Sequence, residues 1–124
     1  YGEMQRDFTY IDDIIEGLYK CCFKTATPDI SFDKNHPDPS TSYAPHRIFN
    51  IGSSRAVKLK YFVEIIEKNL KKKAKIKLCP LPKGDVISTN ADNSALYSWI
   101  GFKPITEIEE GMEHFIKWFK SYYL

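Results

Sequence analysis

The stretch that decides the fold runs Arg6-Asp7-Phe8-Thr9-Tyr10-Ile11-Asp12-Asp13-Ile14-Ile15-Glu16-Gly17. It joins residues that favour a strand, Thr9 to Ile11, to a helix start that Asp12 is placed to cap. The pattern predicts a strand, a tight corner and an amphipathic helix, with an arginine in front of the strand. The apolar side chains of this helix recur at helical spacing: Ile11, Ile14, Ile15, Leu18 and Cys22.

Composition describes an ordinary globular chain. Of its 124 residues, 43% are hydrophobic and 15% aromatic, which is enough to build one modest core. A formal net charge of +2 gives no general attraction to nucleic acid or to a membrane, and we expect neither as a partner. The lysines between 71 and 77 have no aromatic residues among them, so a solvated face is the better interpretation. Three cysteines without C-x-x-C spacing suit a reduced, cytoplasmic protein.

The remaining elements are predicted from the same local signals. A proline-rich loop covers 25–46 and leads into a short buried strand that ends at Gly52. Gly101 stops one helix, and Thr106 with Glu109 forms a capping box for the last. The result is an α/β chain with strands at 47–51 and 75–79, and with helices at 59–70, at 94–100 and from about 106 to the end.

The sequence offers no recognisable catalytic group. No glycine-rich phosphate loop occurs, and no tyrosine is followed four residues later by lysine. The three histidines have no serine or cysteine nucleophile at a known spacing. Asp12 and Asp13 are adjacent, so on a helix they point in different directions and cannot act as an acid and base pair. We therefore predict no catalytic, cofactor-binding or metal-binding residue in this chain.

Two features could contact a ligand. Arg6 precedes an apolar strand, where an arginine either pairs with a neighbouring carboxylate or binds an external anion. Asp85 follows Lys83 and Gly84 in a loop, where it could close a turn or accept hydrogen bonds from vicinal hydroxyls. The residues alone leave both choices open.

Resemblance to a known family adds to this interpretation. Residues 6–13 resemble the R-D-[FY]-x-[HY]-[VI]-x-D segment of extended short-chain dehydrogenase/reductases that act on nucleotide sugars, where it lies past the middle of the chain. Residues 37–52, Pro-Asp-Pro-Ser-Thr-Ser-Tyr-Ala-Pro-His-Arg-Ile-Phe-Asn-Ile-Gly, look like a segment of bacterial UDP-glucuronate 4-epimerases. Related UDP-galactose 4-epimerases and dTDP-glucose dehydratases lack its proline-rich insertion. The match continues through 80–86, 89–92, 101–104 and 109–111.

The resemblance covers the whole chain and is collinear with the C-terminal third of that family. It implies an α/β fold, the C-terminal substrate-binding portion of an extended short-chain dehydrogenase/reductase that lacks most of the Rossmann domain. Residues 1–54 are then expected to pack on the missing cofactor-binding sheet, and residues 55–124 to form a small substrate-binding domain. The apolar stripe of the first helix would be exposed without that sheet.

The resemblance also assigns site residues. Arg6 matches the arginine that engages the diphosphate of a UDP-sugar, and Asp85 matches the acidic residue that holds the uridine ribose. Asn50 and Gly52 would shape the floor of the nucleotide pocket, although turn formation is an equal alternative. Pro82 stands where the family commonly has arginine or glutamine, so one side-chain donor is lost there.

The implied activity belongs to a larger protein. The family interconverts UDP-glucuronate and UDP-galacturonate, for polysaccharide biosynthesis, by NAD-dependent oxidation and reduction at C4. We expect this chain to bind the UDP-sugar, to bind no NAD alone, and to need an N-terminal Rossmann part in cis or as a separate chain. A homodimer of the complete enzyme is expected. The alternatives are a non-catalytic remnant or partner-binding module, or an epimerase or dehydratase for another UDP- or dTDP-sugar.

Overall fold

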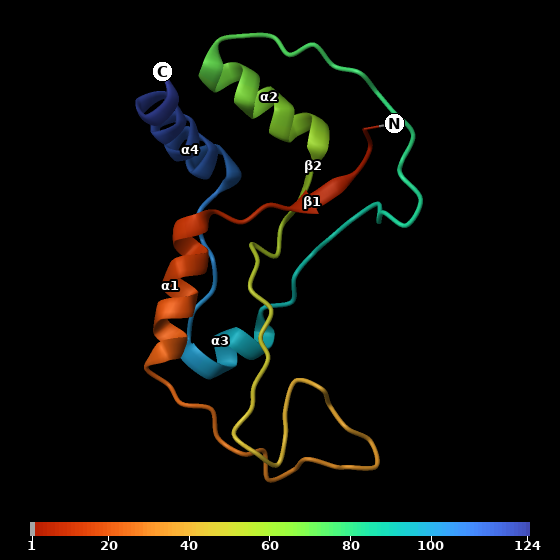
Figure 1. Ribbon diagram of the computed structural model, residues 1–124, viewed down its shortest axis with the longest axis vertical. Helices are drawn as coiled ribbons and strands as arrows, with labels where there is room; N and C mark the ends of the chain where they lie inside the picture. The colour runs from red at the N-terminus through yellow and green to blue at the C-terminus, as the bar shows by residue number, and fades with distance from the viewer. Residues whose placement is uncertain (1) are drawn as a thin grey trace.

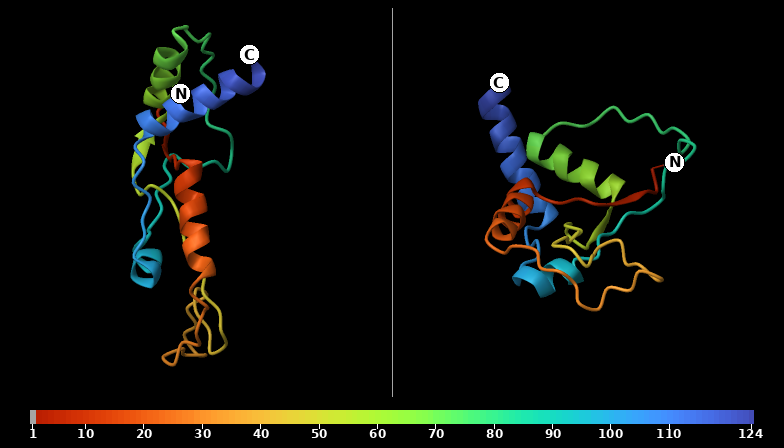
Figure 2. Two further views of the ribbon diagram at one scale, coloured as in Figure 1. Left: turned by 90° about the vertical axis from the view of Figure 1, so that its left-hand side faces the viewer. Right: turned by 60° about the horizontal axis from the view of Figure 1, so that its bottom comes forward.

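The computed structural model describes residues 2–124, so Tyr1 of the expected first segment lies outside it. The described residues form four helices and a two-stranded sheet, arranged as in Figure 1, and the predicted α/β class is confirmed. Two turned views show an elongated molecule with α2 and α4 at one end (Figure 2). The elements are β1 (Gln5–Asp7), α1 (Ile11–Cys22), β2 (Ala56–Lys58), α2 (Leu59–Leu70), α3 (Ser94–Ile100) and α4 (Ile108–Tyr123).

The sheet pairs β1 with β2 in antiparallel register, so that Arg6 lies opposite Val57. The strand predicted at Thr9 to Ile11 is wrong, because those residues lead into α1 and the paired residues lie earlier, at 5–7. Strand β2 was not predicted from the sequence. A strand of three residues carries little local signal, and its position is set by the partner it finds rather than by propensity.

The predicted N-caps of α1 and α4 are wrong. Tyr10 is the N-cap of α1 and makes no side-chain cap, while Asp12 and Asp13 lie inside the first turn, where they face the positive end of the helix dipole. Asp13 is only 5% exposed and accepts a hydrogen bond of 2.9 Å from the amide of Thr106. Because Thr106 is held there, α4 begins later, after Glu107, and no capping box forms with Glu109.

The strands predicted at 47–51 and 75–79 are also wrong. Within residues 2–124, both segments run without a ladder of strand hydrogen bonds. A β-strand needs a neighbour to bond, and local propensity cannot supply one. What remains of extended structure outside the sheet is one isolated bridge, between Gln5 and Ser88.

Helices α2 and α3 span the predicted residues. Gly101 follows α3 with φ of 66°, a left-handed conformation that glycine adopts without strain. Helix α2 packs against α4, and Phe8, just after β1, stacks on Phe62 of α2 with ring centroids 4.1 Å apart. The buried apolar side chains come from α2, α3, the segment after it, and α4: Ile65, Leu96, Phe102 and Ile116.

Helix α1 has two unlike faces. On one face Gly17 lets the side chains of Ile51 and Phe102 approach so closely that a Cβ at Gly17 would lie 2.4 Å from Ile51. On the other face the predicted apolar stripe is largely exposed, and Leu18 keeps 62% of its surface. Of the predicted stripe, Ile11, Ile15 and Leu18 are exposed and Ile14 is half-buried.

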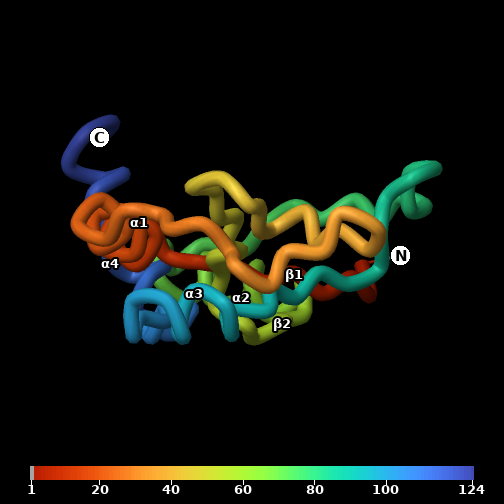
Figure 3. The backbone as a smooth tube through the Cα atoms, turned by 90° about the horizontal axis from the view of Figure 1, so that it is seen from below, coloured from red at the N-terminus to blue at the C-terminus, as the bar shows by residue number. Residues whose placement is uncertain are grey.

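Two long segments extend from this body. Residues 25–46 form the looped excursion beyond the end of α1, at the bottom of Figure 1 and in orange and gold in Figure 3. Residues 71–88 leave α2 and pass around the N-terminal end before they return beside β1, as the green and teal arc in Figure 1. The second excursion brings Asp85 to Arg6.

Candidate functional site

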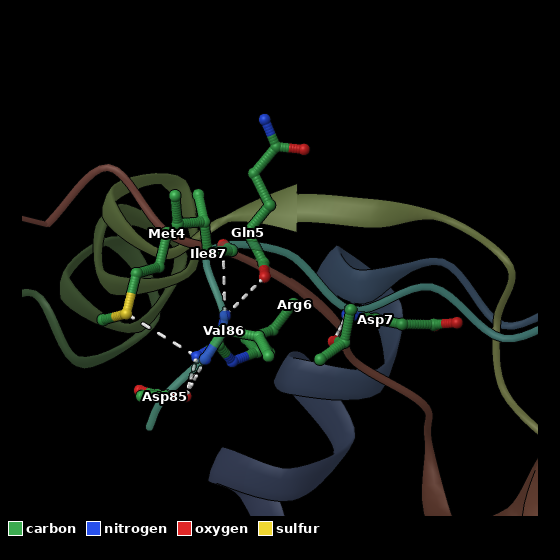
Figure 4. A network of polar contacts seen from close by, with 8 residues as sticks. Met4, Gln5, Arg6, Asp7, Asp85, Val86 and Ile87 are labelled. Atoms are coloured by element: carbon green, nitrogen blue, oxygen red, sulfur yellow. Dashed lines mark hydrogen bonds and ion pairs between the residues drawn. The ribbon is translucent and has the colours of Figure 1, made fainter. Parts of the chain in front are cut away.

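Arg6 lies in the middle of β1 and its guanidinium is directed at the returning excursion. Its Nη2 is 2.8 Å from Oδ1 of Asp85, and its Nη1 donates to the carbonyl oxygens of Gln5 at 2.9 Å and of Ile87 at 3.2 Å (Figure 4). The two charged side chains stay partly accessible, with exposed fractions of 23% for Arg6 and 38% for Asp85. An external anion could therefore reach this guanidinium.

The backbone of the excursion holds Asp85 in place by running along β1. The amide of Gln5 donates to the carbonyl of Ile87 at 2.9 Å, and the amide of Thr89 donates back to the carbonyl of Gln5 at 3.3 Å. Further along, the amide of Asp7 donates to Oγ1 of Thr89 at 3.1 Å. This ladder fixes which residue of the excursion faces Arg6.

Asp7, next to Arg6, accepts hydrogen bonds from two other segments. Its Oδ1 receives the amide of Ser53 at 2.8 Å, and its Oδ2 receives the amides of Ser54 at 3.0 Å and of Ala91 at 2.8 Å. Burial raises the pKa of this carboxyl, but the hydrogen bonds from Ser53, Ala91 and Ser54 outweigh burial and hold the pKa below its ordinary value. Asp7 thereby joins β1 to the turn at 52–54 and to residue 91.

Gly52 lies in this turn and is clamped by Asn93. Its amide donates to Oδ1 of Asn93 at 3.1 Å, and its carbonyl accepts from the Asn93 amide nitrogen. A Cβ at Gly52 would lie 2.6 Å from Cβ of Ala91 and 2.9 Å from Oδ2 of Asp7. The backbone therefore approaches its neighbours so closely that a Cβ would not fit without a shift, which favours glycine at this position.

Asn50 and Gly52 line a hollow of about 350 Å³ together with Asp7, Thr9 and residues 89–91. Asn50 is exposed there, whereas Gly52 is buried. Arg6 and Asp85 do not line this hollow. Of the four predicted site residues, the structure thus brings Arg6 and Asp85 into contact and places Asn50 and Gly52 beyond Asp7.

Three residues that hold this site together were not predicted from the sequence: Asp7, Thr89 and Asn93. Asp7 was visible as the acid next to Arg6 in the quoted run, but nothing local says which distant amides it accepts. Asn93 precedes α3 and has the chemistry of an N-cap, yet its side chain makes no cap and bonds Gly52 instead. The partners of Asp7 and of Asn93 lie far from them in the sequence, and only the fold brings them close.

The described residues do not suit a metal ion, a membrane span or a dinucleotide. Among residues 2–124 no three histidine, cysteine or acidic side chains gather as a metal site, and no helix there is long and apolar enough to span a membrane. The six glycines, at 2, 17, 52, 84, 101 and 111, do not form the closely spaced loop that lets a backbone approach a pyrophosphate. The residues present therefore do not fit a dinucleotide such as NAD.

Comparison with known proteins gives the context of this site. No protein-family model matches the sequence. The chain is 42% identical over 123 residues to Protein CapI of Staphylococcus aureus, which covers 99% of this chain and 37% of that protein. It is 38% identical over 122 residues to UDP-glucuronate 4-epimerase 1 of Arabidopsis thaliana, covering 98% of this chain and 27% of that one.

The chain is similar to the C-terminal portion of UDP-glucuronate 4-epimerases. The resemblance found in the sequence is thus confirmed. The chain spans about a third of the length of the curated relatives that it matches. A solved UDP-glucuronic acid 4-epimerase from Bacillus cereus, in complex with UDP-glucuronic acid and NAD, superposes with a TM-score of 0.72 at 24% identity. That match covers 98% of this chain and 34% of the other, and it establishes the fold of the C-terminal portion.

Proposed function

We propose that this chain is the nucleotide-binding portion of a UDP-glucuronate 4-epimerase, with Arg6 engaging the diphosphate of the UDP-sugar and Asp85 its ribose hydroxyls. The observation that carries the proposal is the contact between these two residues. An arginine donates to phosphate oxygens and a carboxylate accepts from hydroxyls, so adjacent groups of this kind suit adjacent parts of one nucleotide. Asn50 would contribute from the hollow beyond Asp7, and Gly52 by shaping the turn.

Catalysis is assigned to the part of the relatives that this chain does not cover. That part would supply the dinucleotide site and the tyrosine and lysine pair, in cis or as a separate polypeptide. Residues 2–54 would pack on it through the exposed stripe of α1, whose members Ile11, Ile15 and Leu18 have no cover in this structure. Residues 55–124 would form the substrate-binding side. The identity of the sugar is proposed from the relatives alone, because Arg6 and Asp85 are assigned to the diphosphate and the ribose.

Calorimetric titration of the chain with UDP tests the proposal. We expect Arg6→Ala to weaken UDP binding by about 1.5–3 kcal/mol, the usual contribution of a charge-assisted hydrogen bond. Arg47→Ala is the matched control, since Arg47 is also partly buried and faces a carboxylate, Asp29, at 3.5 Å. Equal UDP affinity in wild type and Arg6→Ala would leave Arg6 as a structural ion-pair residue.

A second measurement tests whether cofactor binding and catalysis require the part of the relatives that this chain does not cover. We expect the purified 124-residue chain to bind no NAD and to convert no UDP-glucuronate, because its glycines do not form a phosphate loop. Addition of a polypeptide that carries the remaining part of a relative should restore turnover. Conversion of UDP-glucuronate by the homogeneous chain would overturn this assignment.

A further inference from the structure

We propose that Asp7 is a positioning residue for the nucleotide site: it fixes the direction of Arg6 and the register that places Asp85 beside it. The inference rests on the proposed function and adds a residue to it. Asp7 itself touches no part of the proposed ligand. It acts through the segments it binds.

The side chains of Arg6 and Asp7 point in different directions. Neighbouring residues on a strand point to opposite sides, and Figure 4 shows the guanidinium of Arg6 extending towards Asp85 while Asp7 extends away from it. Fixing Asp7 therefore fixes the rotation of β1 and with it the direction of Arg6. Three amides, from Ser53, Ser54 and Ala91, hold the Asp7 carboxylate.

Asp7 also fixes the register of the excursion along β1. Residues 85–91 follow β1 through two main-chain hydrogen bonds and one from the Asp7 amide to the Thr89 hydroxyl, and the bond from the Ala91 amide to Oδ2 of Asp7 ends this ladder. The stretch before it, 71–84, has no strand partner in the described structure. A slip of one residue along β1 would turn Asp85 to the opposite side. The bond between Asp7 and Ala91 opposes that slip.

A carboxylate is required for this role. Oδ1 accepts from the amide and the hydroxyl of Ser53, and Oδ2 accepts from the amides of Ser54 and Ala91. Asparagine has the same shape but one oxygen only, and its NH₂ group is a donor. Asp7→Asn would set that donor against either the Ser53 side or the Ala91 side. The hydrogen bonds to Ser53 or those to Ser54 and Ala91 must then break.

The experiment is a double-mutant cycle on UDP affinity, measured by calorimetry with wild type, Asp7→Asn, Arg6→Ala and the double variant. We expect Asp7→Asn to weaken UDP binding about tenfold, and to add less than about twofold once Arg6 is alanine, because the two residues act as a unit. Asp29→Asn is the matched control. Its carboxylate also accepts from a serine amide and hydroxyl, those of Ser31, but it lies in the distant excursion 25–46. It should leave UDP affinity unchanged.

The outcomes separate the two proposals. If Arg6→Ala leaves UDP affinity unchanged, the proposed function fails. If Arg6→Ala weakens binding but Asp7→Asn does not, or if their effects simply add, Asp7 is structural only and the positioning role is refuted.

If circular dichroism shows that Asp7→Asn does not fold, a milder variant can test the same positioning role. Thr89→Val removes the hydroxyl that accepts from the Asp7 amide and leaves the carboxylate in place. We expect UDP affinity to fall about threefold, non-additively with Arg6→Ala, and the amide of Gln5, which bonds Ile87, to exchange faster. Unchanged exchange and unchanged affinity would refute the positioning role.

Discussion

Arg6 and Asp85 are 79 positions apart in the sequence, yet Nη2 of one lies 2.8 Å from Oδ1 of the other. Each residue was assigned a separate ligand contact from the sequence. In the structure the two side chains form an ion pair with each other when no ligand is bound. A diphosphate must therefore compete with Asp85 for Arg6. This competition can be measured because pyrophosphate has the phosphates of UDP without its ribose.

Asp85→Asn is expected to weaken UDP binding relative to pyrophosphate binding. Loss of the negative charge frees Arg6, so pyrophosphate should bind more tightly, whereas UDP loses the acceptor proposed for its ribose hydroxyls. The ratio of UDP affinity to pyrophosphate affinity should fall about tenfold. If both ligands gain equally, Asp85 is the ion-pair partner of Arg6 and does not contact ribose.

Gly52→Ala should destabilise the chain through overpacking. The new Cβ would lie 2.6 Å from Cβ of Ala91, and neither backbone can move without loosening the Asp7 bonds. We expect the free energy of unfolding to fall by about 1–3 kcal/mol in chemical denaturation. Gly84→Ala is a useful contrast, because a Cβ there meets no atom within 4 Å and only its φ of 88° opposes the change. Equal stability of Gly52→Ala and wild type would mean that the turn can relax.

The sequence predicted the helices better than it predicted the strands, for a physical reason. Helix α2 runs over the predicted residues because its hydrogen bonds are local and its apolar spacing is set by a single period. The strands at 47–51 and 75–79 were predicted from propensity, but the hydrogen bonds of a strand belong to a partner, and no ladder forms there in the described structure.

The candidate site shows the same division. Arg6 and Asp85 were singled out from their chemistry and given ligand groups by resemblance, but the sequence could not show that they contact each other. Asp7 and Asn93 were missed because their partners, Ala91 and Gly52, are distant in sequence. The capping box predicted at Thr106 was wrong for a related reason, since the amide of Thr106 donates to Asp13, which lies 93 positions away in the sequence.

The stability contributed by Asp7 should depend on pH. Its pKa is lower in the folded chain than the ordinary value of 3.8, so its stabilising effect is complete well above that value and is lost as the pH falls through the lowered pKa. We expect the melting temperature of Asp7→Asn to lie below that of wild type near neutral pH, with a gap that narrows below about pH 4. Thermal unfolding by circular dichroism from neutral to acid pH measures the gap. A constant gap would mean that the charge of Asp7 has no part in its effect.

Gly17→Ala tests the packed face of α1. Alanine normally favours a helix over glycine by about 1 kcal/mol, but a Cβ here would lie 2.4 Å from Ile51 and 3.0 Å from Phe102. We expect net destabilisation in urea unfolding, by about 1–3 kcal/mol. Cys22→Ala, at an exposed position of the same helix, should stay near wild type. A more stable Gly17→Ala would show that Ile51 moves aside.

The exposed face of α1 leads to the last prediction. Ile11, Ile15 and Leu18 retain more than half of their surface, and burial of such a side chain contributes about 1.5–3 kcal/mol. Small domains have a net stability of only about 5–15 kcal/mol, so a missing partner for this stripe matters. We expect the isolated chain to self-associate, or to exchange the amides of α1 quickly while α2 and α4 stay protected. Ile15→Lys with Leu18→Lys should reduce the self-association in analytical ultracentrifugation, whereas Lys34→Glu, a charge change in the excursion 25–46, should not. Strong protection of 12–22 in a monomer at micromolar concentration would contradict this expectation.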